Sequence, residues 1–298
     1  MMRGSIIQTH YLHSGALFMS YRETTLTAFD GTSIFLRTWT PEQPPHAVLM
    51  IVHGLAEHAG RYQYVVDAFL QKGYVIYGHD HRGFGKSGGI RGHWEHFDDV
   101  IKDMDMVVSL ARSEWPELPF GMFAHSMGGV IGIQYLAHHE GKFNAAVISA
   151  PGFGPGPDQN KLLLMLTPLA NKIIPRRPLD RHPPKEYRLS HDPAQAAAWD
   201  ADPLIHPYAT SRWAVEYLRA AKEAKSLLAK LKLPVLVVMG EEDVTIRRDE
   251  IIEAVAAAGP NVTFRTYPGS YHEVHNEIPE IQAPMLAETV SWMEEKLS

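Results

Sequence analysis

Residues 120–129 have the sequence Phe-Gly-Met-Phe-Ala-His-Ser-Met-Gly-Gly. The first four residues form an apolar run typical of a buried strand, and the residues after Met127 keep an apolar helical pattern. Ser126 therefore falls in a very tight turn between a strand and a helix. Such a turn needs small neighbours, here Ala124 and Gly128, because larger side chains would meet the crossing backbone. This context is typical of a nucleophilic serine, although a serine at a helix N-cap has the same local pattern.

The segments on either side of this turn alternate between strand and helix patterns. Runs that are apolar at consecutive positions predict central strands of a covered, mostly parallel sheet. These runs are 47–52, 74–77, 120–123, 145–148 and 235–239, with 262–267 as a more alternating edge strand. Helical patterns lie between them at 62–71, 97–115, 127–139, 248–258 and 280–297. The alternation predicts an α/β fold with a doubly wound sheet.

A hairpin precedes this alternation, and one long segment interrupts it. Strand patterns at 25–29 and 33–39 flank Asp30-Gly31, which is a strong hairpin turn signal. Between Pro151 and about Lys230 no strand pattern occurs, and helical patterns prevail. We therefore expect a mainly helical cap, inserted after the sixth predicted strand.

The predicted domain organisation follows from that interruption. Residues 20–150 and 231–298 form the α/β core, and residues 151–230 form the cap or lid. Residues 1–19 are interpreted as an N-terminal extension, either a leader or a vector-derived segment, with Met19 as an alternative natural start.

Composition excludes several functional classes. The chain has 28 Lys+Arg against 34 Asp+Glu, a net charge of −6, so it lacks the basic excess that nucleic-acid binding requires. It has no cysteine, which excludes disulfides, thiolate metal sites and a cysteine nucleophile. No apolar stretch approaches the roughly 20 residues of a membrane span, and we expect a cytoplasmic protein. The histidines show no metal-binding spacing, so we predict neither a metal nor an organic cofactor.

Two further candidate residues follow strands. Asp243 comes just after the strand at 235–239, and His272 comes just after the strand at 262–267. Active sites of doubly wound sheets lie at the C-terminal ends of strands, and the order Ser126, Asp243, His272 is that of a hydrolase triad. His272 would take the serine proton, and Asp243 would orient and stabilise the imidazole. Taken singly, Asp243 also fits a solvated acidic loop, and His272 fits a surface histidine.

A serine nucleophile that transfers acyl groups also needs an oxyanion hole of backbone amides. The amide of Met127, which follows the nucleophile, is one candidate. Leu55, in the loop after the strand at 47–52, is the other. The preceding residues, His53 and Gly54, would let the backbone pass close to the site, and His53 alternatively has a structural role in binding loop carbonyls.

Four segments carry a resemblance to a known family. Residues 53–62, His-Gly-Leu-Ala-Glu-His-Ala-Gly-Arg-Tyr, resemble the H-G-x-x-E-H-x-x-R-Y signature of the monoacylglycerol lipase-like branch of the α/β-hydrolase superfamily. This branch is also described as the lysophospholipase or serine aminopeptidase group. Residues 80–87 are similar to its D-x-R-G-x-G-x-S turn, and residues 267–277 resemble its histidine segment. Residues 124–129 match its G-H-S-M-G-G segment, except that alanine replaces the first glycine.

The resemblance implies an α/β-hydrolase fold and a serine hydrolase that cleaves carboxylic esters, above all monoacylglycerols, through an acyl-enzyme intermediate. The implied partner is a small lipid or ester substrate. By position, the resemblance also places Glu57, Arg61 and His275 in a glycerol-binding pocket. Glu57 and Arg61 are four residues apart, so they also fit a simple ion pair that stiffens the loop.

Other functions remain open at this stage. A broad carboxylesterase or lysophospholipase would use the same triad with another leaving group. An aminopeptidase would need an acidic subsite for the substrate ammonium, for which Asp200 and Asp202 are the candidates. Dehalogenases and epoxide hydrolases are excluded, since they have aspartate where Ser126 stands. A non-catalytic binding protein of this fold would be expected to have a damaged triad.

The cap contains apolar residues near helical spacing, namely Leu162, Met165, Leu166, Leu169 and Ile173. One interpretation is a lid helix that lines an acyl tunnel and makes transient contact with membranes or micelles. The other is ordinary packing of a cap helix onto the core. Nearby Arg176, Arg177 and Arg181 would attract anionic interfaces, or simply belong to a proline-rich solvated loop.

Overall fold

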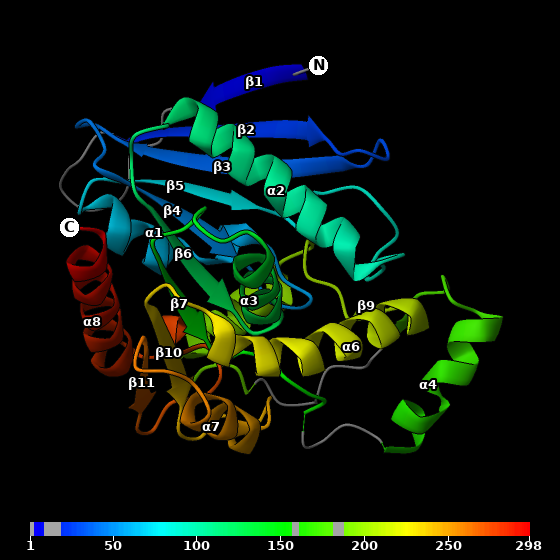
Figure 1. Cartoon of the computed structure of the whole chain (residues 1–298). Coiled ribbons are helices and arrows are strands. Elements are labelled where there is room, and N and C mark those ends of the chain that lie inside the picture. Colours follow the sequence, from blue (N-terminus) through cyan, green and yellow to red (C-terminus); the bar gives the residue numbers. More distant parts are fainter. Residues whose placement is uncertain (1–2, 9–18, 157–160, 181–187) are drawn as a thin grey trace.

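A nine-stranded, mostly parallel sheet runs through the computed structural model, which describes residues 3–8, 19–156, 161–180 and 188–298 (Figure 1). The strand order across this sheet is β1-β2-β3-β5-β4-β6-β7-β10-β11. The strands are β1 (Arg3–Gln8), β2 (Met19–Thr27), β3 (Ser33–Pro41), β4 (Ala47–Val52), β5 (Tyr74–His79), β6 (Phe120–His125), β7 (Ala145–Ser149), β10 (Val235–Gly240) and β11 (Val262–Tyr267). The neighbouring strands from β5 through β4, β6, β7 and β10 to β11 pair in parallel. At the other side of the sheet, β3 pairs antiparallel with β5, β2 with β3, and β1 with β2.

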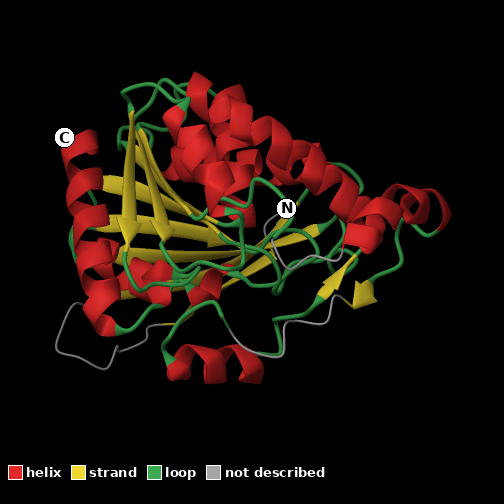
Figure 2. Ribbon diagram, turned by 90° about the horizontal axis from the view of Figure 1, so that it is seen from below, coloured by secondary structure: helices red, strands yellow, loops and turns green. Residues whose placement is uncertain are grey.

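Helices cover both faces of the sheet (Figure 2). Those of the core are α1 (Gln63–Leu70), α2 (Phe97–Glu114), α3 (Met127–His138), α7 (Arg248–Ala256) and α8 (Pro279–Leu297), with short 3-10 turns η1 (Ala59–Arg61) and η3 (Val274–Asn276). Between β7 and β10 lie α4 (Lys161–Ile173), α5 (Pro193–Ala201), α6 (Ser211–Leu227) and η2 (Leu228–Lys230). These elements confirm the predicted α/β class and doubly wound sheet.

The central strand β4 explains why the layers form. All six of its side chains are buried, and they alternate between the two faces of the sheet. Val48, Met50 and Val52 belong to the apolar core shared with α2, α3 and α6. Leu49 and Ile51 belong to the core shared with α1 and α8. A strand that is apolar at every position can therefore be stable only between two helical layers.

Two features differ from the sequence-based expectations. Residues 3–8, which were left outside the predicted core, form β1 and pair with β2, so the insertion follows the seventh strand rather than the sixth. Within the insertion, β8 (Leu179–Asp180) pairs antiparallel with β9 (Tyr208–Ala209), although no strand pattern occurs there. Two-residue strands carry no periodicity, which explains why the sequence did not predict them.

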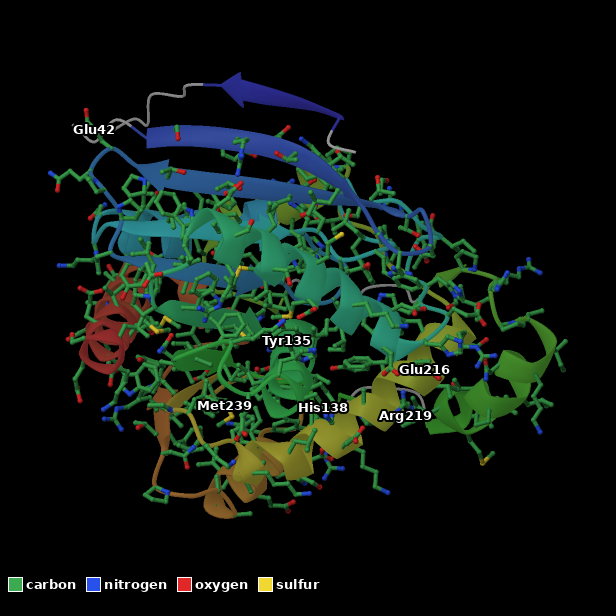
Figure 3. All side chains as sticks on the ribbon, turned by 45° about the horizontal axis from the view of Figure 1, so that its top comes forward. Glu42, Tyr135, His138, Glu216, Arg219 and Met239 are labelled. Atoms are coloured by element: carbon green, nitrogen blue, oxygen red, sulfur yellow. The ribbon has the colours of Figure 1, made fainter. Side chains whose placement is uncertain are left out.

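The insertion is fastened to the core by polar contacts. Glu216 of α6 accepts a hydrogen bond from the Phe97 amide at the start of α2 (3.0 Å) and another from Arg219 (3.1 Å), and both labelled side chains lie on α6 in Figure 3. His58, in the loop after β4, contacts Asp202 Oδ2 through Nε2 at 2.7 Å. These contacts hold the helices of the insertion above the C-terminal ends of the parallel strands.

Within the described ranges, no helix combines the length and the apolar character that crossing a membrane requires.

Candidate active site

Ser126 occupies the tight turn between β6 and α3, with φ +56° and ψ −116°. This conformation is rare outside glycine and costs about 1–3 kcal/mol, so the surroundings must enforce it. A Cβ on Gly128 would lie 2.2 Å from the Val52 carbonyl oxygen, which explains the glycine at that position. Ala124 is tolerated in place of the family's glycine because α3 presents Gly132 opposite its buried methyl group.

The turn places Ser126 in a relay with the two other predicted residues. Ser126 Oγ lies 2.9 Å from His272 Nε2, and His272 Nδ1 lies 2.7 Å from Asp243 Oδ2. His272 and Asp243 are buried, whereas Ser126 keeps some exposed surface. The second oxygen of Asp243, Oδ1, accepts hydrogen bonds from the amides of Thr245 (2.8 Å) and Ile246 (3.3 Å). The structure therefore brings these three side chains into the geometry that proton transfer from serine to histidine requires.

The electrostatics of this relay are set by burial and by Asp243. Burial lowers the pKa of His272, but the negative charge of Asp243 and its hydrogen bond outweigh burial, so the pKa of His272 is raised above its usual 6.5. His272 can accept a proton only in its neutral form.

We therefore expect kcat/KM for a neutral, soluble ester to fall as pH decreases through a single ionisation above 6.5. At higher pH His272 is neutral and the rate should reach a plateau. A pH–rate profile between pH 5 and 9 measures this limb. The rate of labelling by a fluorophosphonate should show the same limb, because it needs the same base. An acid limb centred below 6.5 would contradict the electrostatic assignment.

The backbone amides of Leu55 and Met127 belong to segments that lie beside Ser126. The loop after β4 passes close to Ser126, since a Cβ on Gly54 would lie 3.3 Å from Ser126 Cβ. In the described part of the chain, neither the Leu55 amide nor the Met127 amide donates a hydrogen bond to another protein group. Unsatisfied amides beside a nucleophile are the donors that a tetrahedral oxyanion requires.

The three residues of the predicted glycerol pocket differ in their contacts and in their exposure. Glu57 and Arg61 do meet, with Oε2 and Nη1 2.7 Å apart, and Arg61 also forms a bidentate ion pair with Glu273 (2.8 and 2.8 Å). His275, in contrast, has no exposed surface and stacks on Tyr62, with ring centroids 5.0 Å apart. The structure therefore places His275 beside Tyr62 in a buried position, and its part in a glycerol pocket stays a prediction.

Burial determines the protonation of His275. Among the described residues its two ring nitrogens have no hydrogen-bond partner, and burial lowers the pKa of His275 to about 4. A neutral imidazole is therefore enclosed behind the site. The motif at residues 267–277 would read the same if His275 were exposed. The sequence therefore could not indicate that this ring is buried.

Two residues of this region were not predicted as site residues. Tyr62 donates its hydroxyl hydrogen bond to Glu57 Oε1 (2.7 Å), and Glu273 holds Arg61. Burial raises the pKa of Glu57, whereas the pKa of Glu273 falls to about 2, because Arg61 outweighs burial there. The sequence could have pointed to these two residues only through their positions. Tyr62 is the last residue of the signature at 53–62, and Glu273 directly follows His272.

The insertion contacts the loop that carries His272. The Glu273 amide donates to the Leu189 carbonyl (2.7 Å), and Ser190 Oγ donates to the Asn276 carbonyl (2.7 Å). His191 Nδ1 lies 3.0 Å from the buried carboxylate of Glu277. Residues 189–191 therefore form part of the support of His272.

Among the described residues, no three His, Asp or Glu side chains are arranged so that they could hold a metal ion.

Known proteins share this architecture. A family profile described as serine aminopeptidase, S33 (Hydrolase_4) matches residues 43–279. The chain belongs to this family.

Curated proteins are similar to this chain over nearly its whole length. The monoacylglycerol lipase of Mycolicibacterium smegmatis is 32% identical over 277 residues, which cover 91% of this chain and 96% of that protein. The monoglyceride lipase of Rattus norvegicus is 27% identical over 272 residues, covering 90% of this chain and 89% of that protein. These relatives place the chain among the ester hydrolases of the Hydrolase_4 family.

Solved structures agree with the fold. A soluble variant of the monoglyceride lipase of Saccharomyces cerevisiae, in complex with a substrate analogue, superposes with a TM-score of 0.81 at 19% identity. The match covers 97% of this chain and 98% of that structure. The α/β-hydrolase fold expected from the sequence is thereby confirmed.

Proposed function

We propose that this chain is a serine hydrolase of monoacylglycerols that uses Ser126, His272 and Asp243. The observation that carries the proposal is the relay from Ser126 Oγ through His272 to Asp243, with contacts of 2.9 and 2.7 Å. The names of the similar proteins, monoacylglycerol lipase and monoglyceride lipase, support the substrate class.

In the acylation step, His272 Nε2 takes the hydroxyl proton of Ser126 as Oγ attacks the ester carbonyl carbon. The carbonyl oxygen becomes an oxyanion and accepts hydrogen bonds from the amides of Leu55 and Met127. When the tetrahedral intermediate collapses, the bond to the glycerol oxygen breaks, and His272 returns its proton to that oxygen. Asp243 stabilises the imidazolium throughout and remains ionised.

Deacylation repeats this chemistry with water. His272 takes a proton from a water molecule that attacks the acyl-enzyme carbonyl, and the same two amides bind the second oxyanion. The bond to Ser126 Oγ then breaks, His272 returns the proton to the serine, and a free fatty acid leaves.

We also propose that the polar pair of Glu57 and Arg61 recognises the glycerol side of the substrate. The ring of Trp199 on α5 packs against the guanidinium of Arg61, with 4.6 Å between Arg61 Cζ and the ring centroid. A cation, a carboxylate and an aromatic wall suit a small polyol, since its hydroxyls donate as well as accept hydrogen bonds.

The test compares substrates with the same acyl chain and different leaving groups. Wild type is assayed with a monoacylglycerol, its methyl ester, its p-nitrophenyl ester, the corresponding lysophospholipid and an aminoacyl anilide. We expect the highest kcat/KM for the monoacylglycerol and no cleavage of the anilide. Activity on p-nitrophenyl esters alone would overturn the glycerol assignment and leave a broad carboxylesterase.

A further part of the proposal concerns contact with lipid surfaces. On α4, the apolar side chains of Leu162, Met165, Leu166, Leu169 and Ile173 have exposed fractions of 45–71%. Their spacing places them along one helix face, and α4 lies at the outer end of the insertion (Figure 1). An apolar helix face of this size in water is typical of a surface that docks on lipid. We propose a cytoplasmic enzyme that binds monoacylglycerol-containing surfaces reversibly through this face.

We therefore expect the double variant Met165→Glu, Leu169→Glu to lose at least about tenfold in rate on monoacylglycerol dispersed in phosphatidylcholine vesicles, because charges replace two exposed apolar side chains that would enter the lipid surface. Its rate on a soluble short-chain ester should stay within about twofold. Ile252→Glu on α7 is the control, since Ile252 is exposed as well (51%) but lies outside this face. Equal losses on both substrates would contradict a docking role.

A further inference from the structure

The loop that supplies the Leu55 amide is held at each of its peptide groups. The peptide between His53 and Gly54 is fixed at both ends: Gly54 N–H donates to Glu57 Oε1 at 2.6 Å, and the His53 carbonyl lies 3.2 Å from His81 Nε2. The next peptide, between Gly54 and Leu55, carries the amide that would bind the oxyanion. Its carbonyl oxygen lies 2.8 Å from His53 Nδ1.

The ring of His53 is held in one tautomer by its second contact. The His81 amide donates to His53 Nε2 at 2.9 Å, and a backbone N–H can only donate. Nε2 is therefore the acceptor, and a neutral imidazole must then carry its hydrogen on Nδ1, which donates to the Gly54 carbonyl. Burial lowers the pKa of His53 well below its usual value, so the ring stays neutral under the conditions in which His272 works.

The planar Gly54–Leu55 peptide couples the hydrogen bond at the Gly54 carbonyl to the orientation of the Leu55 amide. In a trans peptide the C=O and the N–H point in opposite directions, so a donor that holds the Gly54 carbonyl also sets the direction of the Leu55 N–H. The anchor matters because position 54 is glycine, and a Cβ there would lie 2.6 Å from Glu57 Oε1. Glycine leaves the backbone free to rotate unless side chains restrain it.

We propose that His53 is a positioning residue of the oxyanion hole, which holds the Gly54–Leu55 peptide so that the Leu55 amide faces the substrate carbonyl. The inference rests on the proposed function. His53 touches neither the substrate nor Ser126 in this role, and it acts through one peptide group.

The test compares three replacements of His53 with a control. His53→Leu removes both ring contacts. His53→Asn places an amide nitrogen near the position of Nδ1, whereas His53→Gln places it near Nε2, away from the Gly54 carbonyl. The control is His79→Leu, since His79 is equally buried but neither of its ring nitrogens has a hydrogen-bond partner in the part of the chain that the structure describes.

The readouts are kcat and KM on a soluble ester, and the inhibition constant of a trifluoromethyl ketone with the same acyl chain. This ketone forms a tetrahedral adduct with the serine and places its oxyanion in the same hole. For His53→Leu we expect kcat to fall by about 10²-fold, KM to stay within about threefold and ketone binding to weaken by a similar factor as kcat. His53→Asn should recover at least about tenfold of the loss, and His53→Gln should not. His79→Leu should stay within about twofold of wild type.

Three results would overturn the inference: unchanged kcat in His53→Leu, a loss of kcat with unchanged ketone affinity, or an equal loss in His79→Leu. If His53→Leu fails to fold, the test is the comparison of His53→Asn with His53→Gln. Equal activities of these two variants would overturn the inference. The proposed function fails separately: wild type would then neither hydrolyse esters nor react with a fluorophosphonate. Active wild type with unaffected His53 variants would refute only the positioning role.

Discussion

Replacement of Ser126 by alanine should lower kcat for ester hydrolysis by about 10⁶-fold, to the level of residual catalysis by the remaining site. The variant lacks the oxygen that lies 2.9 Å from His272 Nε2 and attacks the carbonyl carbon. Steady-state hydrolysis of a monoacylglycerol and labelling by a fluorophosphonate both measure this loss. Alanine should relieve none of the enforced backbone geometry, so the fold and the unfolding temperature should be nearly unchanged.

Ser149→Ala is the matched control for this variant. Ser149 is buried, and its hydroxyl lies 3.1 Å from His125 Nδ1, beside the relay but not in it. We expect Ser149→Ala to keep kcat within about threefold. A Ser126→Ala variant that retained a tenth of the wild-type rate would refute the nucleophile assignment.

Replacement of Asp243 by asparagine should lower kcat by about 10⁴-fold, although it changes the shape of the site very little. Oδ1 of Asp243 accepts two backbone amides, so asparagine would keep its oxygen there and turn its NH₂ group toward His272. His272 Nδ1 would then have to accept, and its hydrogen would move to Nε2, facing Ser126. In this tautomer the imidazole cannot take the serine proton.

Two measurements separate this effect from damage to the fold. The affinity for a ground-state analogue such as the corresponding acyl amide should stay within about threefold, because the substrate contacts are intact. The unfolding temperature should drop only slightly. If Asp243→Asn kept kcat within tenfold, Asp243 would not be the residue that orients His272.

The parts of the fold that could be predicted are those in which local pattern and tertiary environment agree. The strand at 47–52 is apolar at every position because both of its faces are covered, and so its burial follows from the sequence alone. The positions of Asp243 and His272 were predictable for a related reason: parallel strands end at one edge of the sheet, so residues just after them converge there.

The remaining features depend on contacts that no local pattern encodes. Arg61 and Glu273 lie 212 residues apart in sequence, and only the fold brings them to 2.8 Å. The burial of His275 depends on which neighbours its ring meets, so the motif alone could not show that this ring is buried. The pairing of residues 3–8 with β2 was missed because an edge strand needs no apolar core face.

The contact of residues 189–191 with the histidine loop limits how modular this protein is. An engineer who grafted the whole segment between β7 and β10 from a relative would also exchange the groups that meet Glu273, Asn276 and Glu277. Selectivity and turnover would then change together, and a poor chimera would be misread as a poor substrate fit. Exchange of residues 161–173 alone leaves those contacts in place, so α4 is the natural unit for redesigning substrate range.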